Sequence, residues 1–261
     1  MTDTIFINAR LIDPVAQTDT LGALRVRDGL IAEVYEEPKP DVAGMTVNCA
    51  GNCLAPGIVD IGVKVSEPGE RHKESFRSAG RAAAAGGVTT IVTRPDTLPA
   101  IDLPETLEFV SRRAALDAPV RVLPMAALTK GRDGAVMTEI GFLQDAGAVA
   151  FTDCDRVVTN TKVFSRALTY ARSLGALVIA HVQDPGLSEG AAVTSGKFAS
   201  LRGLPGVTPM AERMALDRDI ALLEMTGARY HADQITTARA LPALERAKRN
   251  GLNITAGVGV H

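Results

Sequence analysis

Residues 57–69 read Gly-Ile-Val-Asp-Ile-Gly-Val-Lys-Val-Ser-Glu-Pro-Gly (GIVDIGVKVSEPG), and this stretch decides the fold. Apolar β-branched residues occupy every second position, which predicts a strand. Alternation then gives the strand two faces, which hold Val59, Ile61, Val63 and Val65 on one side and Asp60, Gly62 and Lys64 on the other. In a barrel the valine face packs on helices, and Lys64 lies nearest the carboxyl-terminal mouth, where barrel enzymes hold their catalytic groups. The alternative is that Lys64 extends into solvent.

The chain after Pro56 alternates short apolar runs with Ala-, Leu- and Arg-rich segments of helical period. The expected strands lie near 57–65, 88–94, 120–127, 147–152, 176–181, 228–235 and 252–258. Most of them start about thirty residues apart, the length of one βα unit, and a Gly-, Pro- and Ser-rich excursion from Asp184 to Pro209 follows the fifth. We therefore predict an α/β fold, a (β/α)8 barrel over residues 56–261 rather than an open doubly wound sheet. An eighth unit is not in this sequence, so we expect a truncated or partly represented protein.

Residues 1–55 have a different residue pattern from the rest of the chain. The runs 4–12, 21–35 and 45–50 are β-rich and are separated by Asp-Gly and Pro. This pattern is typical of hairpins without long helices. We predict a small β unit that precedes the barrel.

Composition excludes several classes of function. The chain has 261 residues, 46% hydrophobic and 22% charged, with a formal charge of −2. It therefore lacks the basic excess that nucleic acids or anionic membranes attract. No leader pattern or long apolar run is present, which predicts a cytoplasmic protein without a membrane segment. Cys49, Cys53 and Cys154 are expected to be free thiols rather than a zinc site.

Five motifs in order resemble the barrel of dihydroorotases, members of the amidohydrolase superfamily. They are APGIVDIGVKVSEPGERHKESFRSAGRAAAAGGVTTIVTRPDTLPAID at 55–102, GAVAFTDCD at 147–155, RALTYARSLGALVIAHVQDP at 166–185, LRGLPGVTPMAE at 201–212 and GARYHADQITT at 227–237. The opening strand of that family reads VDxHxHxREPG. The resemblance spans essentially the whole chain and also implies a composite β unit that a C-terminal segment completes. That segment, and the late Asp-containing motif that supplies the family's catalytic base, are not in this sequence.

The resemblance implies a zinc site, because the family uses a divalent metal to polarise an amide carbonyl and to activate water. The two strand-one histidines of the family fall on Gly62 and Lys64, and the strand-six histidine falls on Gln234. Only the strand-four carboxylate, Asp153, and the strand-five histidine, His181, are retained. Two ligands cannot fix a catalytic zinc ion, which takes three protein ligands and water. We therefore expect no cofactor, or zinc if the protein is active.

The resemblance also implies a changed substrate pocket. The family's arginine after the strand-one histidines falls on Ser66, and its asparagine falls on Asp96. These exchanges disfavour an anionic substrate. Arg94 shares a strand face with Asp96 and is expected to pair with it. Outside the family positions, His72 is expected in a solvated loop, His231 as a hydrogen-bonded structural residue, and His261 is the last residue.

Three hypotheses for function remain. The first is a non-catalytic dihydroorotase-like protein of pyrimidine biosynthesis that forms an oligomer, with itself or with aspartate transcarbamoylase, for which the family offers a precedent in some bacteria. The second is an active dihydroorotase or related cyclic amidase whose unusual metal site is completed by residues outside this chain. The third is a small-molecule binder or altered hydrolase that uses the old pocket.

The retained carboxylate and the new lysine suggest an electrostatic exchange. If Lys64 points into the mouth while Asp153 keeps its family position, the ammonium group takes the place of the positive metal. We therefore predict that Lys64 lies within salt-bridge or one-water reach of Asp153.

Overall fold

The computed structural model describes residues 3–41 and 43–259, which form two compact units that divide between Ile58 and Val59. The boundary expected from the sequence lay at 55/56. His261 lies outside the described residues. Among the residues that are described, no helix is both long enough and apolar enough to cross a membrane.

The first unit is a sheet in the order β3-β2-β1-β4, with β5 also paired to β1. Its strands are β1 (Thr4–Asp13), β2 (Thr18–Arg27), β3 (Leu30–Tyr35), β4 (Met45–Asn48) and β5 (Cys53–Leu54). The β2–β3 hairpin turns at Asp28 and Gly29, whose φ angles of 50° and 79° suit an Asp-Gly pair. A small core of Ile5, Ile7 and Ala23 lies on one face.

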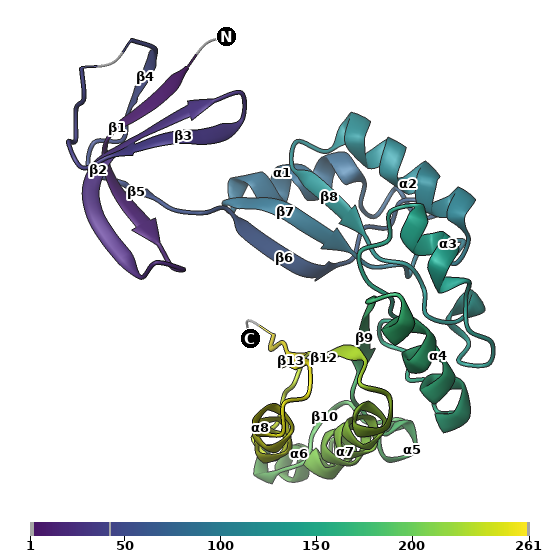
Figure 1. Cartoon of the computed structure of the whole chain (residues 1–261). Helices are drawn as coiled ribbons and strands as arrows, with labels where there is room; N and C mark the ends of the chain where they lie inside the picture. Colours follow the sequence, from purple (N-terminus) through teal and green to yellow (C-terminus); the bar gives the residue numbers. More distant parts are fainter. Residues whose placement is uncertain (1–2, 42, 260–261) are drawn as a thin grey trace. The chain divides into compact units, whose positions relative to one another are not determined.

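The second unit contains two three-stranded sheets in the orders β6-β7-β8 and β13-β12-β9. Their strands are β6 (Ile58–Val63), β7 (Val88–Thr93), β8 (Arg121–Pro124), β9 (Leu177–His181), β12 (Arg229–Asp233) and β13 (Ile254–Ala256). Phe151 forms parallel bridges to Ala126 and to Val178 and so connects the two sheets. The seven expected strand positions therefore follow one another in the order of a parallel barrel (Figure 1).

The expected fourth strand, 147–152, is wrong as a regular strand. Val149 and Thr152 donate backbone hydrogen bonds toward β8, and Phe151 donates toward β9. The segment forms β-bridges only at Phe151, and its first residue, Gly147, has φ 108°. The segment still occupies the fourth position and delivers residues 153–155 to the mouth of the barrel.

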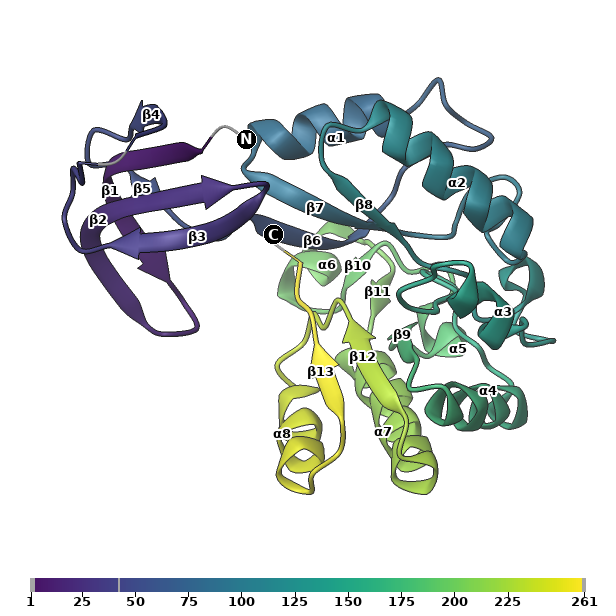
Figure 2. The same cartoon turned by 45° about the horizontal axis from the view of Figure 1, so that its top comes forward.

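Helices follow the strands in the expected alternation: α1 (Phe76–Ala85), α2 (Pro104–Asp117), α3 (Ile140–Asp145), α4 (Thr161–Ser173), α7 (Pro209–Thr226) and α8 (Leu241–Arg249). Caps mark their ends, since Ser75 forms a capping box with Ser78, and Thr208 caps α7 just before Pro209. Helices α1 and α2 lie along β7 and β8, and α8 lies along β13 (Figure 2). The excursion after β9 holds α5 (Pro185–Ser188), β10 (Val193–Thr194), α6 (Lys197–Arg202) and β11 (Gly206–Val207).

The core of the second unit has two parts. The larger part lies between the strands and the helices and includes Ile91, Val178 and Tyr230. The smaller part consists of Val92, Met125, Ala150 and Ile179 and lies on the opposite face of the strands. Alternate residues of β7 and β9 thus reach different cores, as expected for strands buried on both faces.

The predicted valine face of β6 is correct only in its second half. Val63 and Val65 join the helix-side core, whereas Val59 and Ile61 are each 55% exposed. Ile61 lines a small cavity together with Met125 and Ile179 of the inner core. Gly62, at φ 91°, interrupts the alternation, so the side chains before and after it face opposite ways.

Candidate site at the carboxyl ends of the strands

Asp153 is held by hydrogen bonds to both of its carboxylate oxygens. Oδ1 accepts from the backbone N–H groups of Leu128 and Thr129, each at 3.0 Å, and Oδ2 accepts from the Thr129 hydroxyl at 2.5 Å. The residue is 4% exposed. Burial raises the pKa of the Asp153 carboxyl, against the lowering effects of these hydrogen bonds and of the charge of Arg132. The carboxylate therefore anchors the loop after β8.

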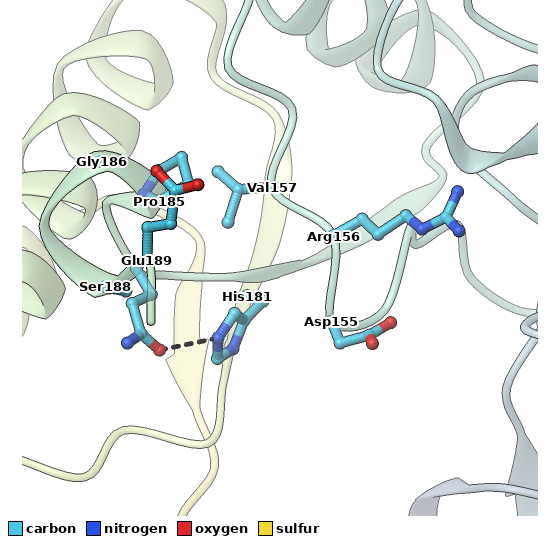
Figure 3. A pocket seen from close by; sticks show the side chains of 9 residues that line it. Asp155, Arg156, Val157, His181, Pro185, Gly186, Ser188 and Glu189 are labelled. Carbon is cyan, nitrogen blue, oxygen red and sulfur yellow. Dashed lines mark hydrogen bonds between the residues drawn. The ribbon is translucent and has the colours of Figure 1, made fainter. Parts of the chain in front are cut away.

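His181 is the last residue of β9 and lies at the edge of a cavity of about 580 Å³. Its Nε2 atom is 3.0 Å from Oε1 of Gln183, the contact drawn as a dashed line in Figure 3. Because that oxygen can only accept, Nε2 carries the proton. Asp155 and Arg156 line the same cavity, and in Figure 3 the Arg156 side chain extends away from His181.

Asp153 and His181 also line one very small cavity of about 10 Å³. The other family positions do not converge on it. Gly62 has no side chain, and Gln234, which follows β12 directly, is exposed and has φ 52°. Gly62 and Gln234 instead line a separate cavity of about 570 Å³ beside β6 and β13.

The direct salt bridge expected between Lys64 and Asp153 does not form, and Lys64 pairs with another carboxylate. Lys64 Nζ lies 3.1 Å from Oδ2 of Asp96, and the lysine side chain is 58% exposed. The physical reason is that the Asp153 carboxylate is already satisfied by Leu128 and Thr129. Asp96, at 4% side-chain exposure, is instead a buried carboxylate in need of cations.

Five charged residues form a chain of ion pairs, the mouth cluster, defined as Lys64, Arg94, Asp96, Arg132 and Asp155. Arg94 Nη2 lies 3.4 Å from Asp96 Oδ2, which confirms the expected pairing, and 3.6 Å from Asp155 Oδ1. Arg132 pairs with Asp155 and donates from Nε and Nη2 to the Asp153 carbonyl oxygen at 3.2 and 3.1 Å. Partial burial acts to raise the pKa of Asp155, but a backbone hydrogen bond and the charges of Arg132 and Arg94 lower it overall.

Ser66 is buried at 9% exposure, and its carbonyl oxygen accepts a hydrogen bond from the backbone of Glu70. The adjacent Glu67, at 4% exposure, accepts from the Phe76 N–H at 3.1 Å and from Arg113 Nε at 3.0 Å. The loop after β6 is thus tied to the start of α1 and to α2. A hydroxyl in this buried position does not supply the bidentate contact of an arginine.

The remaining histidines behave as ordinary residues. His72 is exposed in the loop after β6. His231 Nδ1 lies 2.8 Å from the Thr255 hydroxyl, the hydrogen-bonded structural role expected of it.

Cys154 is buried beside the mouth cluster, and burial raises the pKa of its thiol to about 11.

The residues at the family's ligand positions do not fit zinc. Tetrahedral coordination needs three converging nitrogen, sulfur or carboxylate ligands with free lone pairs. Within residues 3–41 and 43–259, no three His, Cys, Asp or Glu side chains lie close enough together to hold a metal ion. Lys64 is a cation and supplies no ligand. The Asp153 carboxylate accepts three hydrogen bonds, which leave it at most one free lone pair, and together with His181 it makes two ligands rather than three.

Sequence reasoning missed Thr129, Arg132 and Asp155. Thr129 and Asp153 are separated by 24 residues, and nothing in the local sequence links them. Asp155 carried a signal, because its acidic side chain stands two residues after Asp153 at the end of an expected strand. Its partner Arg132 lies in the loop after the third strand, but this loop also holds Lys130, so the sequence alone does not single out Arg132.

Comparison with known proteins identifies the family of the chain. Residues 51–240 match the family described as dihydro-orotase-like. The chain is 39% identical over 255 residues to the dihydroorotase-like protein of Pseudomonas putida, an alignment that covers 98% of this chain and 60% of the relative. It is 36% identical over 261 residues to the dihydroorotase of Syntrophobacter fumaroxidans, with 98% and 60% covered. The chain therefore spans about 60% of the length of the curated relatives it matches.

Solved structures superpose on this chain and confirm the expected barrel fold. L-hydantoinase (dihydropyrimidinase) from Arthrobacter aurescens superposes with a TM-score of 0.83 at 20% identity, covering 99% of this chain and 58% of that one. D-hydantoinase from Thermus sp. gives a TM-score of 0.75 at 19% identity, with 98% and 57% covered. At these identities the likeness concerns the fold.

Proposed function

The chain belongs to the dihydro-orotase-like family of the amidohydrolase superfamily, and from that premise we propose that it is a non-catalytic member. In this proposal the protein acts in pyrimidine biosynthesis as an assembly partner of aspartate transcarbamoylase. The observation that carries the non-catalytic part is the state of Asp153. The one carboxylate retained from the family's ligand set is committed to Leu128 and Thr129.

The substrate side supports the same proposal. Lys64 and Arg94 are both paired with Asp96, which stands at one of the family's substrate positions, and the Arg94 guanidinium is also shared with Asp155. Asp96 brings a negative charge to the position of a neutral amide. An anionic cyclic substrate therefore gains no free cation from Arg94 and meets an added carboxylate.

The assembly part of the proposal rests on the family and on the barrel fold, which this chain keeps without the family's ligand set. A barrel kept without its ligand set is most simply retained for a surface rather than for a pocket. The relatives from Pseudomonas putida and Pseudomonas aeruginosa, 39% and 37% identical, both carry the name dihydroorotase-like protein. A stable assembly would bury on the order of 2,000 Å².

The test measures turnover and association with the full-length protein. Dihydroorotate hydrolysis is followed with and without added zinc, with a dihydroorotase that retains all its ligands as positive control. The mass of the protein is measured by light scattering at micromolar concentration, alone and with aspartate transcarbamoylase. We expect no turnover above buffer and a stable oligomer or complex. Zinc-dependent turnover contradicts the non-catalytic role. A monomer whose measured mass does not change when the transcarbamoylase is added contradicts the assembly role.

The second candidate is an active cyclic amidohydrolase with an unusual site. The observation that favours it is His181, which remains at the edge of a cavity of about 580 Å³. Superfamily members are generally metal-dependent, so this candidate requires zinc and further ligands from outside this chain. Zinc-dependent turnover in the same assay would support it.

A further inference from the structure

We propose that the mouth cluster replaces a metal ion as the element that holds the carboxyl ends of the first four barrel strands together. This inference rests on the proposed non-catalytic function, and it adds a physical reason why the barrel mouth keeps its shape without metal. It concerns only residues of this chain.

The connectivity of the cluster carries the proposal. Lys64 follows β6, Arg94 and Asp96 follow β7, Arg132 lies in the 3-10 turn Lys130–Arg132 after β8, and Asp155 follows the Phe151 bridge. The pair Lys64–Asp96 joins the first strand end to the second, and Arg94–Asp155 joins the second to the fourth. Arg132 joins the third to the fourth through Asp155 and the Asp153 carbonyl. A metal ion with ligands from several strands makes the same kind of cross-link.

The charges of the cluster suit that role. Three cations and two carboxylates leave one net positive charge at the mouth. The two arginines stay protonated at any physiological pH and donate through a rigid planar group. The cross-link therefore does not depend on the supply of a metal.

Burial shows which members matter most. Asp96, Arg132 and Arg94 have side-chain exposures of 4%, 11% and 17%, whereas Lys64 and Asp155 are 58% and 71% exposed. Among the described residues, Asp96 Oδ1 and Arg94 Nε are buried without a hydrogen-bond partner. Asp96 consequently depends on the cations beside it, and Arg94 is the buried one. Lys64 acts through a screened, solvent-exposed contact.

A double-mutant cycle tests the inference on the full-length protein, treated with EDTA and unfolded in urea. Because it leaves a buried carboxylate unpaired, Arg94→Met should raise the unfolding equilibrium constant by roughly 100-fold. Asp96→Asn in that background should recover part of the loss, so that the double variant is at least about tenfold more stable than the two single effects predict. Lys64→Met should change the constant by less than about fivefold.

The control is the pair Arg213–Asp217 on α7, at 2.6 Å with side-chain exposures of 23% and 40%. Arg213→Met and Asp217→Asn should change the constant by less than about threefold and should show little coupling. If Arg94→Met does not fold, Asp155→Asn serves instead, because it breaks contacts to both arginines at an exposed position; a loss of about tenfold is expected.

Independent, multiplicative effects of Arg94 and Asp96 overturn the inference. So does a urea midpoint that EDTA lowers and zinc restores in the unmodified protein. The Arg94–Asp96 coupling can be found in a protein that hydrolyses dihydroorotate, or in one that forms no oligomer and no complex with the transcarbamoylase. Either result contradicts only the proposed function. The two proposals therefore fail on different readouts.

Discussion

Asp153 and Glu212 show at residue level how this chain uses buried carboxylates. Asp153 accepts from two consecutive backbone N–H groups and one threonine hydroxyl. Glu212, at 7% exposure, accepts from the N–H groups and hydroxyls of Thr236 and Thr237 at 2.7 to 3.0 Å. Each carboxylate fixes the backbone just beyond a strand. The residue type at position 153 is that of a ligand, but its contacts are those of a structural anchor.

The anchor role predicts the effect of Asp153 substitutions. Asp153→Ala leaves two buried N–H groups unpaired and should lower the free energy of unfolding by about 3 kcal/mol. Asp153→Asn keeps an acceptor oxygen and should cost about 1 kcal/mol. Urea unfolding measures both, and Asp145→Ala, at an exposed position on α3, is the matched control with an expected change within about 0.5 kcal/mol. An alanine variant as stable as the control would remove the anchor role.

At the level of single residues, the sequence shows which residue types stand at the family's ligand positions. It does not show which side chains they contact. The resemblance identifies Gly62, Lys64 and Gln234 as departures from the family's histidines because the motif around each position is intact. The partner of Lys64 is not legible. It depends on which carboxylate remains unsatisfied after folding, and the competing donors to Asp153 come from Leu128 and Thr129, more than twenty residues away.

Among the elements, apolar periodicity predicted the positions of the strands well. The predictions that were wrong concern segments whose backbone conformation the periodicity does not show. The ends of β7 and β9 fall within two residues of expectation, because their apolar runs are buried on both faces. The two misjudged segments each contain a glycine with positive φ, Gly62 in β6 and Gly147 before Phe151. Composition shows that glycine permits such a conformation but not that the chain adopts it.

The contact between β12 and β13 predicts a pH effect. Burial lowers the pKa of His231 below its ordinary value of 6.5, although Asp233 acts in the opposite direction. The unfolded chain therefore takes up this proton at a higher pH than the folded chain. Stability contributed by neutral His231 is present above about pH 6.5 and is lost as the pH falls through the folded pKa.

His231→Gln removes this titration and can keep a hydrogen bond to Thr255. Between pH 7 and pH 5, the unmodified protein should lose more unfolding free energy than the variant. Urea unfolding at a series of pH values measures the difference. His72→Gln, an exposed control, should follow the unmodified protein. Parallel curves for all three proteins would exclude His231 as the source.

At the scale of the whole molecule, the barrel follows from the sequence because seven repeats of one motif leave few alternatives. The site does not follow in the same way. A metal centre needs side chains from several strands to converge, and each strand contributes through its own local backbone. The residue types at 62, 64 and 234 say little about the contacts at the mouth, since the mouth cluster is assembled from four strand ends.

Rebuilding the metal centre tests this view of the whole barrel. Because Gln234 lines a cavity separate from that of Asp153 and His181, Lys64→His with Gln234→His should leave zinc affinity within about threefold of the unmodified protein, although imidazole is a good zinc ligand. Adding Thr129→Val, which releases one Asp153 oxygen, should not change this result. Titration against a chromophoric chelator measures each step, with Lys64→Met and Gln234→Met as the matched control. An affinity at least about tenfold higher in the histidine variant than in the methionine control would show that the strand ends converge.

Gly62 differs from the other family ligand positions in its backbone conformation. A histidine at this position has room for its Cβ but must adopt φ near 91°, which disfavours any L side chain by about 1–3 kcal/mol. Reversion at positions 64 and 234 replaces one side chain by another, whereas reversion at 62 also requires the backbone to turn. Substitution by histidine at 62 is therefore expected to lower the free energy of unfolding before it can supply a ligand, an added backbone cost that substitution at 64 or 234 does not carry.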